Sequence, residues 1–296
     1  MIENERFQFL IDRVDTELVR YFADKDLTCN PLDRAMEYTL LAGGKRLRPL
    51  LTLVVCDAFG SDVEAALPFA MVSEIMHTYS LIHDDLPSMD NDDMRRGKPT
   101  NHIVFGEANA ILAGDALQSE AFLLLAESPH PALSPQRRIE IIAELCHAIG
   151  RRGMVAGQVM DLSLEGKEID LEHLKLLHQR KTGGLFRYCI RLGGHLANLN
   201  SEVMADLTEY ATALGLLFQV VDDLLDEEGD SVSLGKTAGK DREADKATFP
   251  KVMGARAAHE FADNLLIQAE GALANFKGDA KKHLREIVRF IRNRDL

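Results

Sequence analysis

Apolar residues recur at i, i+3, i+4 and i+7 along most of this chain of 296 residues. This spacing is the period of an amphipathic α-helix, and the alternating, β-branched stretches that strands require are few. No segment repeats at a fixed period, and no breaker has the composition of a domain linker. We therefore predict an all-α fold in which residues 1–296 form a single domain, a bundle of long antiparallel helices.

Glycine and proline divide the periodic stretches into helices, whose ends are set to within about two to four residues. The longer breakers are the segment from Pro87 to Thr100 and the segment from Gly229 to Gly239. The predicted helices cover residues 3–24, 32–42, 47–59, 62–86, 105–127, 134–150, 153–165, 171–194, 202–228, 243–253, 255–275 and 279–293.

Charge and cysteine usage limit the partners and the compartment. The net charge of −13, from 47 acidic and 34 basic residues, repels nucleic-acid phosphates, so nucleic acid is excluded as a partner. No apolar run approaches the roughly 20 residues that cross a bilayer, so no transmembrane segment is expected. The cysteines lie far apart without a C-x-x-C pair, and the N-terminus lacks an apolar signal-peptide core. These features predict a reduced, cytoplasmic protein.

A first acidic cluster ends the predicted helix 62–86 and places five carboxylates within ten residues, between Asp84 and Asp93. Pro87 cannot continue a helix, so the chain turns after Leu86 and Asp90 returns toward Asp84. Carboxylates at a helix C-terminus oppose the macrodipole unless a cation compensates them. A solvated acidic helix end is the alternative, and we expect a cation site.

A second acidic cluster closes a strongly apolar helical stretch. Asp222 and Asp226 are four residues apart and share a helix face, and Asp223 stands between them. Two acidic helix ends that face each other across a bundle make an oxygen-only cage, which favours Mg²⁺ over Zn²⁺. Mg²⁺ typically keeps waters and bridges to substrate phosphates, so we predict a phosphate-bearing substrate.

Basic residues lie beside glycines or acidic clusters. They supply the positive charge that a phosphate bound to Mg²⁺ still needs. Lys45 and Arg48 follow a glycine turn at a helix start, where backbone N–H groups favour anions. Each Lys or Arg alone reads as a solvated surface charge, and His77 alone reads as a core histidine. The basic candidates at the remaining turns are Arg95, Arg96, Lys181, Lys236 and Lys240.

With these residues the chain resembles the trans-isoprenyl diphosphate synthases, in the form typical of bacterial farnesyl diphosphate synthases. The two aspartate-rich motifs of that family resemble Asp84-Asp85-x-x-x-x-Asp90 and Asp222-Asp223-x-x-Asp226. Further similar segments are Gly43–Pro49, Arg95-Arg96-Gly97, Gly106–Ala110, Ala113–Leu117, Gln158, Lys181-Thr182-Gly183 and Leu234–Thr237. Asn91 departs from the family, whose members often carry another Asp there, and we expect this to change the surrounding charge and not metal binding.

The resemblance implies the isoprenoid synthase fold, with a central cavity, and a homodimer. It implies a Mg²⁺-dependent prenyltransferase that condenses isopentenyl diphosphate with dimethylallyl or geranyl diphosphate to give (2E,6E)-farnesyl diphosphate and diphosphate. It assigns the isopentenyl diphosphate to Gly44, Lys45, Arg48, His77 and Arg96, the allylic diphosphate to Arg95, Lys181 and Lys236, and Mg²⁺ to Asp84, Asp90 and Asp222. Thr182 and Gln219 would point their oxygens toward the reacting carbons, so the implied catalytic set is Lys181, Thr182, Gln219, Arg95 and Lys236.

Product length depends on the residues just before the first aspartate. Tyr79 precedes Asp84 by five residues, about 7.5 Å along a helix axis. In similar synthases a bulky aromatic at this spacing stops growth at fifteen carbons, although an ordinary core aromatic is the alternative. Ser80 is small and leaves the pocket above open. Should Tyr79 not form the floor, Met76 and Phe122 are the next candidates.

Three other activities compete with this prediction. A terpene cyclase would carry a different second metal motif and more aromatic residues than the 6% found here, without Trp. A non-catalytic partner subunit of a prenyl synthase typically loses an aspartate cluster, and this chain keeps both. A geranylgeranyl or longer polyprenyl diphosphate synthase is the nearest enzymatic alternative, because it shares every motif named above.

Overall fold

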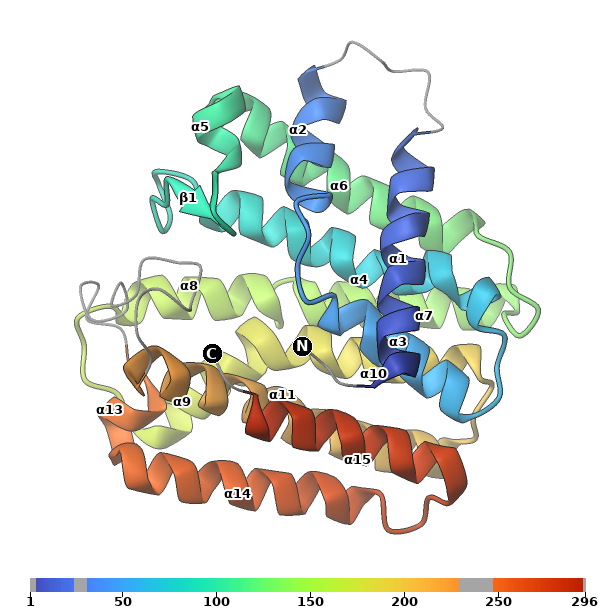
Figure 1. Cartoon of the computed structure of the whole chain (residues 1–296). Coiled ribbons are helices and arrows are strands. Elements are labelled where there is room, and N and C mark those ends of the chain that lie inside the picture. The colour runs from blue at the N-terminus through green and yellow to red at the C-terminus, as the bar shows by residue number, and fades with distance from the viewer. Residues whose placement is uncertain (1–3, 24–30, 229–246, 295–296) are drawn as a thin grey trace.

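The computed structural model of the protein describes residues 4–23, 31–228 and 247–294. Nearly all regular structure in these residues is helical, which confirms the predicted all-α fold (Figure 1). The helices are α1 (Glu5–Ala23), α2 (Pro31–Leu40), α3 (Leu47–Ala58), α4 (Val63–Asp84), α5 (Asn101–Phe105), α6 (Glu107–Glu127), α7 (Pro135–Ile149), α8 (Met154–Leu164), α9 (Leu171–His178), the π-helix η1 (Gln179–Gly183), α10 (Gly184–Leu196), α11 (Ser201–Glu228), α13 (Phe249–Met253), α14 (Ala255–Ala272) and α15 (Gly278–Asn293).

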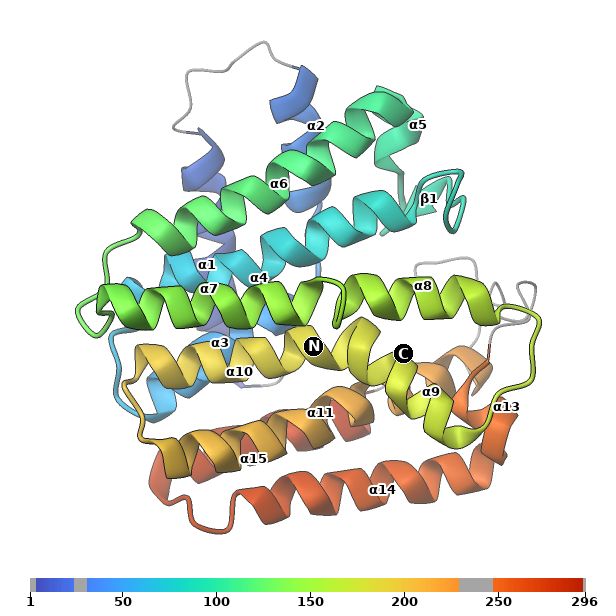
Figure 2. The ribbon, with the colours of Figure 1, turned by 180° about the vertical axis from the view of Figure 1, so that it is seen from behind.

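Helix packing brings the two acidic regions to opposite sides of one helix. α4 packs against α6 and α3, while α11 packs against α10 and α14. In both views α10 lies between α4 and α11, the helices that carry the aspartate clusters (Figures 1 and 2). α7 and α8 follow one another along the back of the bundle (Figure 2). Both aspartate clusters are therefore held by long helices, α4 and α11.

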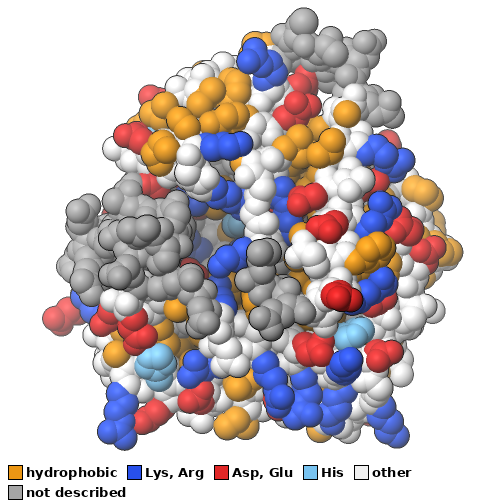
Figure 3. Space-filling model, viewed as in Figure 1, with side chains coloured by type: hydrophobic (Ala, Val, Ile, Leu, Met, Phe, Trp, Pro, Cys, Tyr) orange, Lys and Arg blue, Asp and Glu red, His pale blue; other side chains and the backbone are white. Residues whose placement is uncertain are grey.

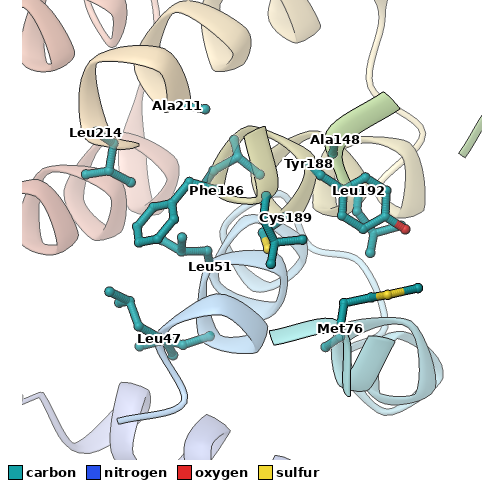
Figure 4. Packing of buried hydrophobic residues seen from close by; sticks show 14 of the residues in the cluster. Leu47, Leu51, Met76, Ala148, Phe186, Tyr188, Cys189, Leu192, Ala211 and Leu214 are labelled. Carbon is teal, nitrogen blue, oxygen red and sulfur yellow. The ribbon is translucent and has the colours of Figure 1, made fainter. Parts of the chain in front are cut away.

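Part of the core lies where α3 meets α10. Phe186 and Cys189 of α10 point toward Leu47 and Leu51 of α3 (Figure 4). Burying each large apolar side chain stabilises the fold by about 1.5–3 kcal/mol. A Cβ added at Gly193 would lie 2.6 Å from a backbone carbonyl oxygen of α3, so glycine permits this close approach. The packed pair forms a rigid floor for the polar residues above it.

Two predicted helices are interrupted in the structure. The predicted helix 105–127 is preceded by the short helix α5 and starts after Gly106, whose φ of 81° lies in a region that glycine tolerates. The predicted helix 171–194 becomes α9, η1 and α10. Both interruptions keep the apolar periodicity nearly intact, so the pattern alone does not reveal them.

The segment from Pro87 to Thr100, predicted only as a breaker, contains a hairpin of β1 (Met94–Arg95) and β2 (Lys98–Pro99). Its strands are too short for an alternating pattern. The first part of the predicted helix 243–253 lies outside the described residues, and α13 begins at Phe249.

The cavity and membrane predictions concern the molecule as a whole. The predicted central cavity stays a prediction. Among the described residues, one hollow borders α2 and α6 and another lies beside α15. Among the described helices, none combines the length and the apolarity that crossing a membrane demands.

Candidate functional site

The chain reverses direction directly after α4. The backbone N–H of Asp90 donates to the carbonyl oxygen of Asp84 at 2.8 Å, and that of Asp92 to the carbonyl oxygen of Asp85 at 3.2 Å. Pro87 favours the reversal because it cannot continue a helix. The predicted return of Asp90 toward Asp84 is confirmed, and the acidic side chains gather at one end of α4.

Arg95 partly compensates the charge of this turn. Its guanidinium donates to both carboxylate oxygens of Asp85, with distances of 2.8 and 2.9 Å from Nε and 2.6 Å from Nη2. Asp92 lies 3.8 Å from the same guanidinium. Bidentate geometry of this kind fixes the direction of the guanidinium. Asp85, 1% exposed, therefore orients Arg95 beside the other aspartates.

Asp84 carries the clearest electrostatic sign of a cation site. The pKa of Asp84 is raised to about 6, chiefly by burial and also by Asp90, although Lys181 and Arg95 oppose the shift. A cation held by these oxygens would offset both burial and like-charge repulsion. Oxygen-only donors suit Mg²⁺, so the residues of the turn fit that ion.

The aspartates do not form a complete cage by themselves. Within residues 4–23, 31–228 and 247–294, no group of three or more His, Cys, Asp or Glu side chains is arranged to hold a metal ion. Mg²⁺ usually keeps waters and takes substrate phosphate oxygens as further ligands. The structure thus fits a metal that binds together with a diphosphate.

Lys181 and Thr182 lie on a π-helical turn, η1, between α9 and α10. Single π-turns inside α-helices are frequent at functional sites. A Cβ at Gly157 of α8 would lie 2.4 Å from the backbone nitrogen of Lys181, and one at Gly215 of α11 would lie 2.9 Å from a Cα of the turn. Two glycines therefore let neighbouring helices clamp the turn and fix the direction of its side chains.

The Lys181 ammonium lies between two acidic groups from different helices. Its Nζ donates to Oδ2 of Asp161 on α8, and its charge also lowers the pKa of Asp84 on α4. The structure thus brings Lys181 into electrostatic contact with the first aspartate cluster.

Gln219 belongs to a hydrogen-bonded chain that starts at the π-turn. Thr182 Oγ1 donates to Gln219 Oε1 at 3.2 Å, and Gln219 Nε2 donates to Asp223 Oδ1 at 2.8 Å. The other oxygen of Asp223 accepts from the backbone N–H of Phe249 at 3.0 Å. The chain orients the Gln219 amide, with its oxygen toward Thr182, and leaves Asp222 as the outer carboxylate of the second motif.

Asp222 is paired with a residue that no sequence motif predicts. Arg294 Nη2 donates to Asp222 Oδ1 at 3.0 Å and to the carbonyl oxygen of Phe218 at 2.8 Å. The C-terminal helix is amphipathic and basic, but nothing in its pattern directs one arginine to α11. Lys236, the other predicted cation near this motif, lies outside the described residues.

The glycine turn before α3 lies against Arg96. The Arg96 guanidinium donates to the carbonyl oxygen of Gly43. A Cβ at Gly44 would lie 2.8 Å from the same guanidinium, and the φ of 138° at Gly44 is a conformation that other residues rarely adopt. Arg96 itself has a φ of 52°, which turns its side chain toward this loop. The structure therefore joins the predicted Gly44 and Arg96.

Arg48 and its predicted companions lie around the same loop. The Arg48 guanidinium lies over the ring of Phe186 at 5.2 Å, and burial lowers its pKa. Its Nε has no hydrogen-bond partner. Lys45 is exposed beside it, and His77 on α4 is half-buried. A guanidinium with one buried, unpartnered nitrogen next to an exposed lysine suits an anionic ligand.

The two predicted chain-length residues are consecutive on α4. Tyr79 is 5% exposed and sets its ring edge-on to His83, whose Nε2 lies 3.0 Å from the carbonyl oxygen of Ile111 on α6. Tyr79 therefore lies toward α6. Ser80, one turn before Asp84, donates to the carbonyl oxygen of His77 at 2.8 Å.

Comparison with known proteins agrees with this geometry. The sequence profile described as polyprenyl synthetase matches residues 29–287. The chain is 46% identical over 265 residues to a chloroplastic geranylgeranyl pyrophosphate synthase of Catharanthus roseus, covering 89% of this chain and 74% of that protein. It is also 46% identical over 256 residues to a farnesyl diphosphate synthase of Geobacillus stearothermophilus, covering 86% of each. A geranyltransferase of Helicobacter pylori, solved with magnesium and isoprenyl diphosphate, superposes with a TM-score of 0.82 at 31% identity over 96% of this chain and 94% of that one.

Proposed function

The chain belongs to the polyprenyl synthetase family and is a prenyltransferase, and from this premise we propose that it is a Mg²⁺-dependent farnesyl diphosphate synthase. It condenses isopentenyl diphosphate with dimethylallyl or geranyl diphosphate and releases diphosphate. The observation that carries the proposal is the position of Lys181, which meets Asp161 and acts on the charge of Asp84. A diphosphate bound to the aspartate turn would meet this ammonium.

The residues around that diphosphate have distinct tasks in the proposal. Asp84, Asp90 and Asp222 would hold Mg²⁺, which when bound would supply positive charge to the allylic diphosphate as a leaving group. Lys181 and Arg95 add fixed positive charge at the same group, and such preoriented charge favours the transition state.

The carbon chemistry needs few side chains. The isopentenyl double bond attacks the allylic cation, and a proton then leaves, with the departed diphosphate as its acceptor. The oxygens of Thr182 and Gln219 face the reacting carbons and stabilise positive charge there. Their hydrogen-bonded chain to Asp223 holds them in place. The packed apolar floor of α3 and α10 excludes water, which would quench the cation.

Tyr79 supports the fifteen-carbon product over geranylgeranyl or longer products. The hydrocarbon tail runs from the aspartate turn along α4 toward α6, where the buried Tyr79 ring lies. An aromatic at this depth ends the pocket. The relatives include enzymes named for both fifteen- and twenty-carbon products, so their names do not decide the product. The proposed fifteen-carbon product therefore rests on Tyr79.

We also propose a homodimer that forms through α5 and α6. Large apolar side chains are exposed on these helices, among them Ile103, Val104, Ile111, Leu112 and Leu123. Hydrophobic atoms gather over this part of the surface (Figure 3). A patch of this kind favours a second copy over solvent. Light scattering should give twice the chain mass, and Leu112→Glu should give the monomer mass.

The scattered cysteines support a cytoplasmic setting.

Diphosphate release tests the activity. The purified protein is mixed with Mg²⁺, isopentenyl diphosphate and either dimethylallyl or geranyl diphosphate. The proposal predicts release only when both substrates are present. Release from the allylic substrate alone would indicate a cyclase, and no release with any pair would indicate a non-catalytic subunit.

A further inference from the structure

A buried ion pair lies beneath the glycine turn and has no task in the reaction described above. Glu74 of α4 accepts a hydrogen bond at 2.6 Å from Nη1 of Arg46, and both side chains are 2% exposed. Removing two charges from water costs about as much as their attraction returns. Stability alone therefore does not explain the pair, and its use lies in what it holds in place.

Arg46 connects three segments to the loop that it belongs to. Its Nε donates to Asp15 of α1 at 2.7 Å, and its Nη2 donates to the carbonyl oxygen of Leu40 at the end of α2 at 2.9 Å. The backbone of Arg46 has a φ of 46°, a left-handed conformation that costs about 1–3 kcal/mol outside glycine. The side-chain contacts offset this cost and hold the loop in one conformation.

That loop carries the basic residues assigned to isopentenyl diphosphate. Lys45 and Arg48 flank Arg46 in the chain, and Arg96 donates to the carbonyl oxygen of Gly43. Burial lowers the pKa of Arg48 and of Arg96, and Glu74 is the largest opposing charge for both. Without this carboxylate, three neighbouring guanidinium groups would repel one another.

We propose that Glu74 is a positioning residue for the diphosphate of isopentenyl diphosphate. Through Arg46 it fixes the glycine turn, and through its charge it sets the spacing of Arg48 and Arg96, while it does not touch the substrate itself. The inference rests on the proposed function, because it takes the basic loop as the isopentenyl diphosphate site.

The isosteric variant Glu74→Gln separates positioning from simple electrostatics. If Glu74 only added negative charge, its removal would make the site more cationic and lower KM for isopentenyl diphosphate. Positioning predicts the opposite: KM for isopentenyl diphosphate rises about tenfold, as is typical when an outer partner is lost. KM for geranyl diphosphate and kcat stay within about twofold. An unchanged or lower KM for isopentenyl diphosphate would overturn the proposal.

Matched variants separate positioning from lost stability. Glu144→Gln breaks a less buried ion pair, in which Glu144 lies 2.6 Å from Arg191 between α7 and α10, and should lower Tm without raising KM. Glu74→Asp keeps the charge and should recover part of the affinity. If Glu74→Gln does not fold, Arg46→Lys keeps the positive charge but loses the planar fork, and the same rise in KM is expected.

Direct binding distinguishes this inference from the proposed function. Calorimetry with isopentenyl diphosphate measures affinity without turnover. A native protein that does not bind isopentenyl diphosphate would contradict the proposed function. Binding by the native protein that is matched by Glu74→Gln would overturn the positioning role alone.

Discussion

Arg294, directly after α15, donates a hydrogen bond to Asp222 of α11 at 3.0 Å. Its guanidinium also lies 4.1 Å above the ring of Phe218, and its side chain is 5% exposed against 47% for Asp222. A buried cation of the protein thus rests on a carboxylate that we assign to Mg²⁺. Arg294 and the proposed Mg²⁺ would therefore bind the same carboxylate, that of Asp222.

Arg294→Leu should lower the Mg²⁺ concentration that gives half-maximal activity several-fold. The leucine keeps apolar packing over Phe218 but removes the charge that competes with Mg²⁺ at Asp222. Activity titrated with Mg²⁺ measures the effect. Arg292→Leu, which removes the ion pair of Arg292 in α15 with Asp263 in α14, is the control and should leave the titration unchanged. A higher Mg²⁺ requirement in Arg294→Leu would contradict the competition.

Asp84→Asn should lower turnover by orders of magnitude while it stabilises the metal-free fold. The pKa of Asp84 is raised to about 6, so the folded protein disfavours the ionised form and stability falls as pH rises from about 3.8 to 6. Asparagine removes this penalty, on the order of 1–3 kcal/mol at pH 7. Tm at pH 7 and steady-state rates check both parts. Near-normal turnover would remove Asp84 from the metal site.

Gly157→Ala should lower kcat more than it lowers Tm. The added Cβ would lie 2.4 Å from the backbone nitrogen of Lys181, so either α8 or the π-turn must move. Lys181 then points away from the aspartate turn, and misplacement of this size costs about a hundredfold in rate. Gly271→Ala, where an added Cβ meets nothing within 4 Å, is the control. Equal kcat in both variants would show that the clamp has no catalytic role.

Tyr79→Ala should shift the product from farnesyl toward geranylgeranyl diphosphate. Loss of the ring opens the space between α4 and α6 that we assign to the growing tail. Ser80→Phe should shorten the product toward geranyl diphosphate, because the new ring fills the space one turn before Asp84. Chromatography of the dephosphorylated products measures both. An active Tyr79→Ala enzyme that makes only the fifteen-carbon product would move the floor to Met76 or Phe122.

His178→Phe should flatten the loss of stability on the acid side. Burial lowers the pKa of His178 from 6.5 to about 4, although Asp161 and Asp222 oppose the shift. The unfolded chain therefore binds more protons between these values, and stability falls as pH drops from about 6.5 to 4. The native protein should lose about 2 kcal/mol more than His178→Phe between pH 7 and pH 5. Parallel unfolding curves at both pH values would contradict this.

The sequence alone predicts structural features that follow from a repeated pattern or from a single residue. Helical periodicity predicts the bundle, because each helix must bury an apolar face. Pro87 predicts the reversal that returns Asp90 to Asp84, because proline cannot continue the helix. Both features follow from local conformational preferences, which do not depend on contacts with distant segments.

The sequence was insufficient where distant segments meet. The π-turn at Lys181 depends on Gly157 and Gly215, which belong to other helices. Arg46 and Glu74 are 28 residues apart, and Arg294 and Asp222 are 72 apart, with no spacing that links them. Such pairs follow from tertiary packing, which a single pattern does not encode.

Product chain length tests the central claim most directly. The purified protein is supplied with Mg²⁺, labelled isopentenyl diphosphate in excess and dimethylallyl diphosphate, and the dephosphorylated products are separated by chromatography. A farnesyl diphosphate synthase gives farnesol as the end product, with geraniol only as an early intermediate. Accumulation of geranylgeraniol or longer alcohols would contradict the fifteen-carbon assignment, and an absence of any labelled product would contradict the prenyltransferase itself.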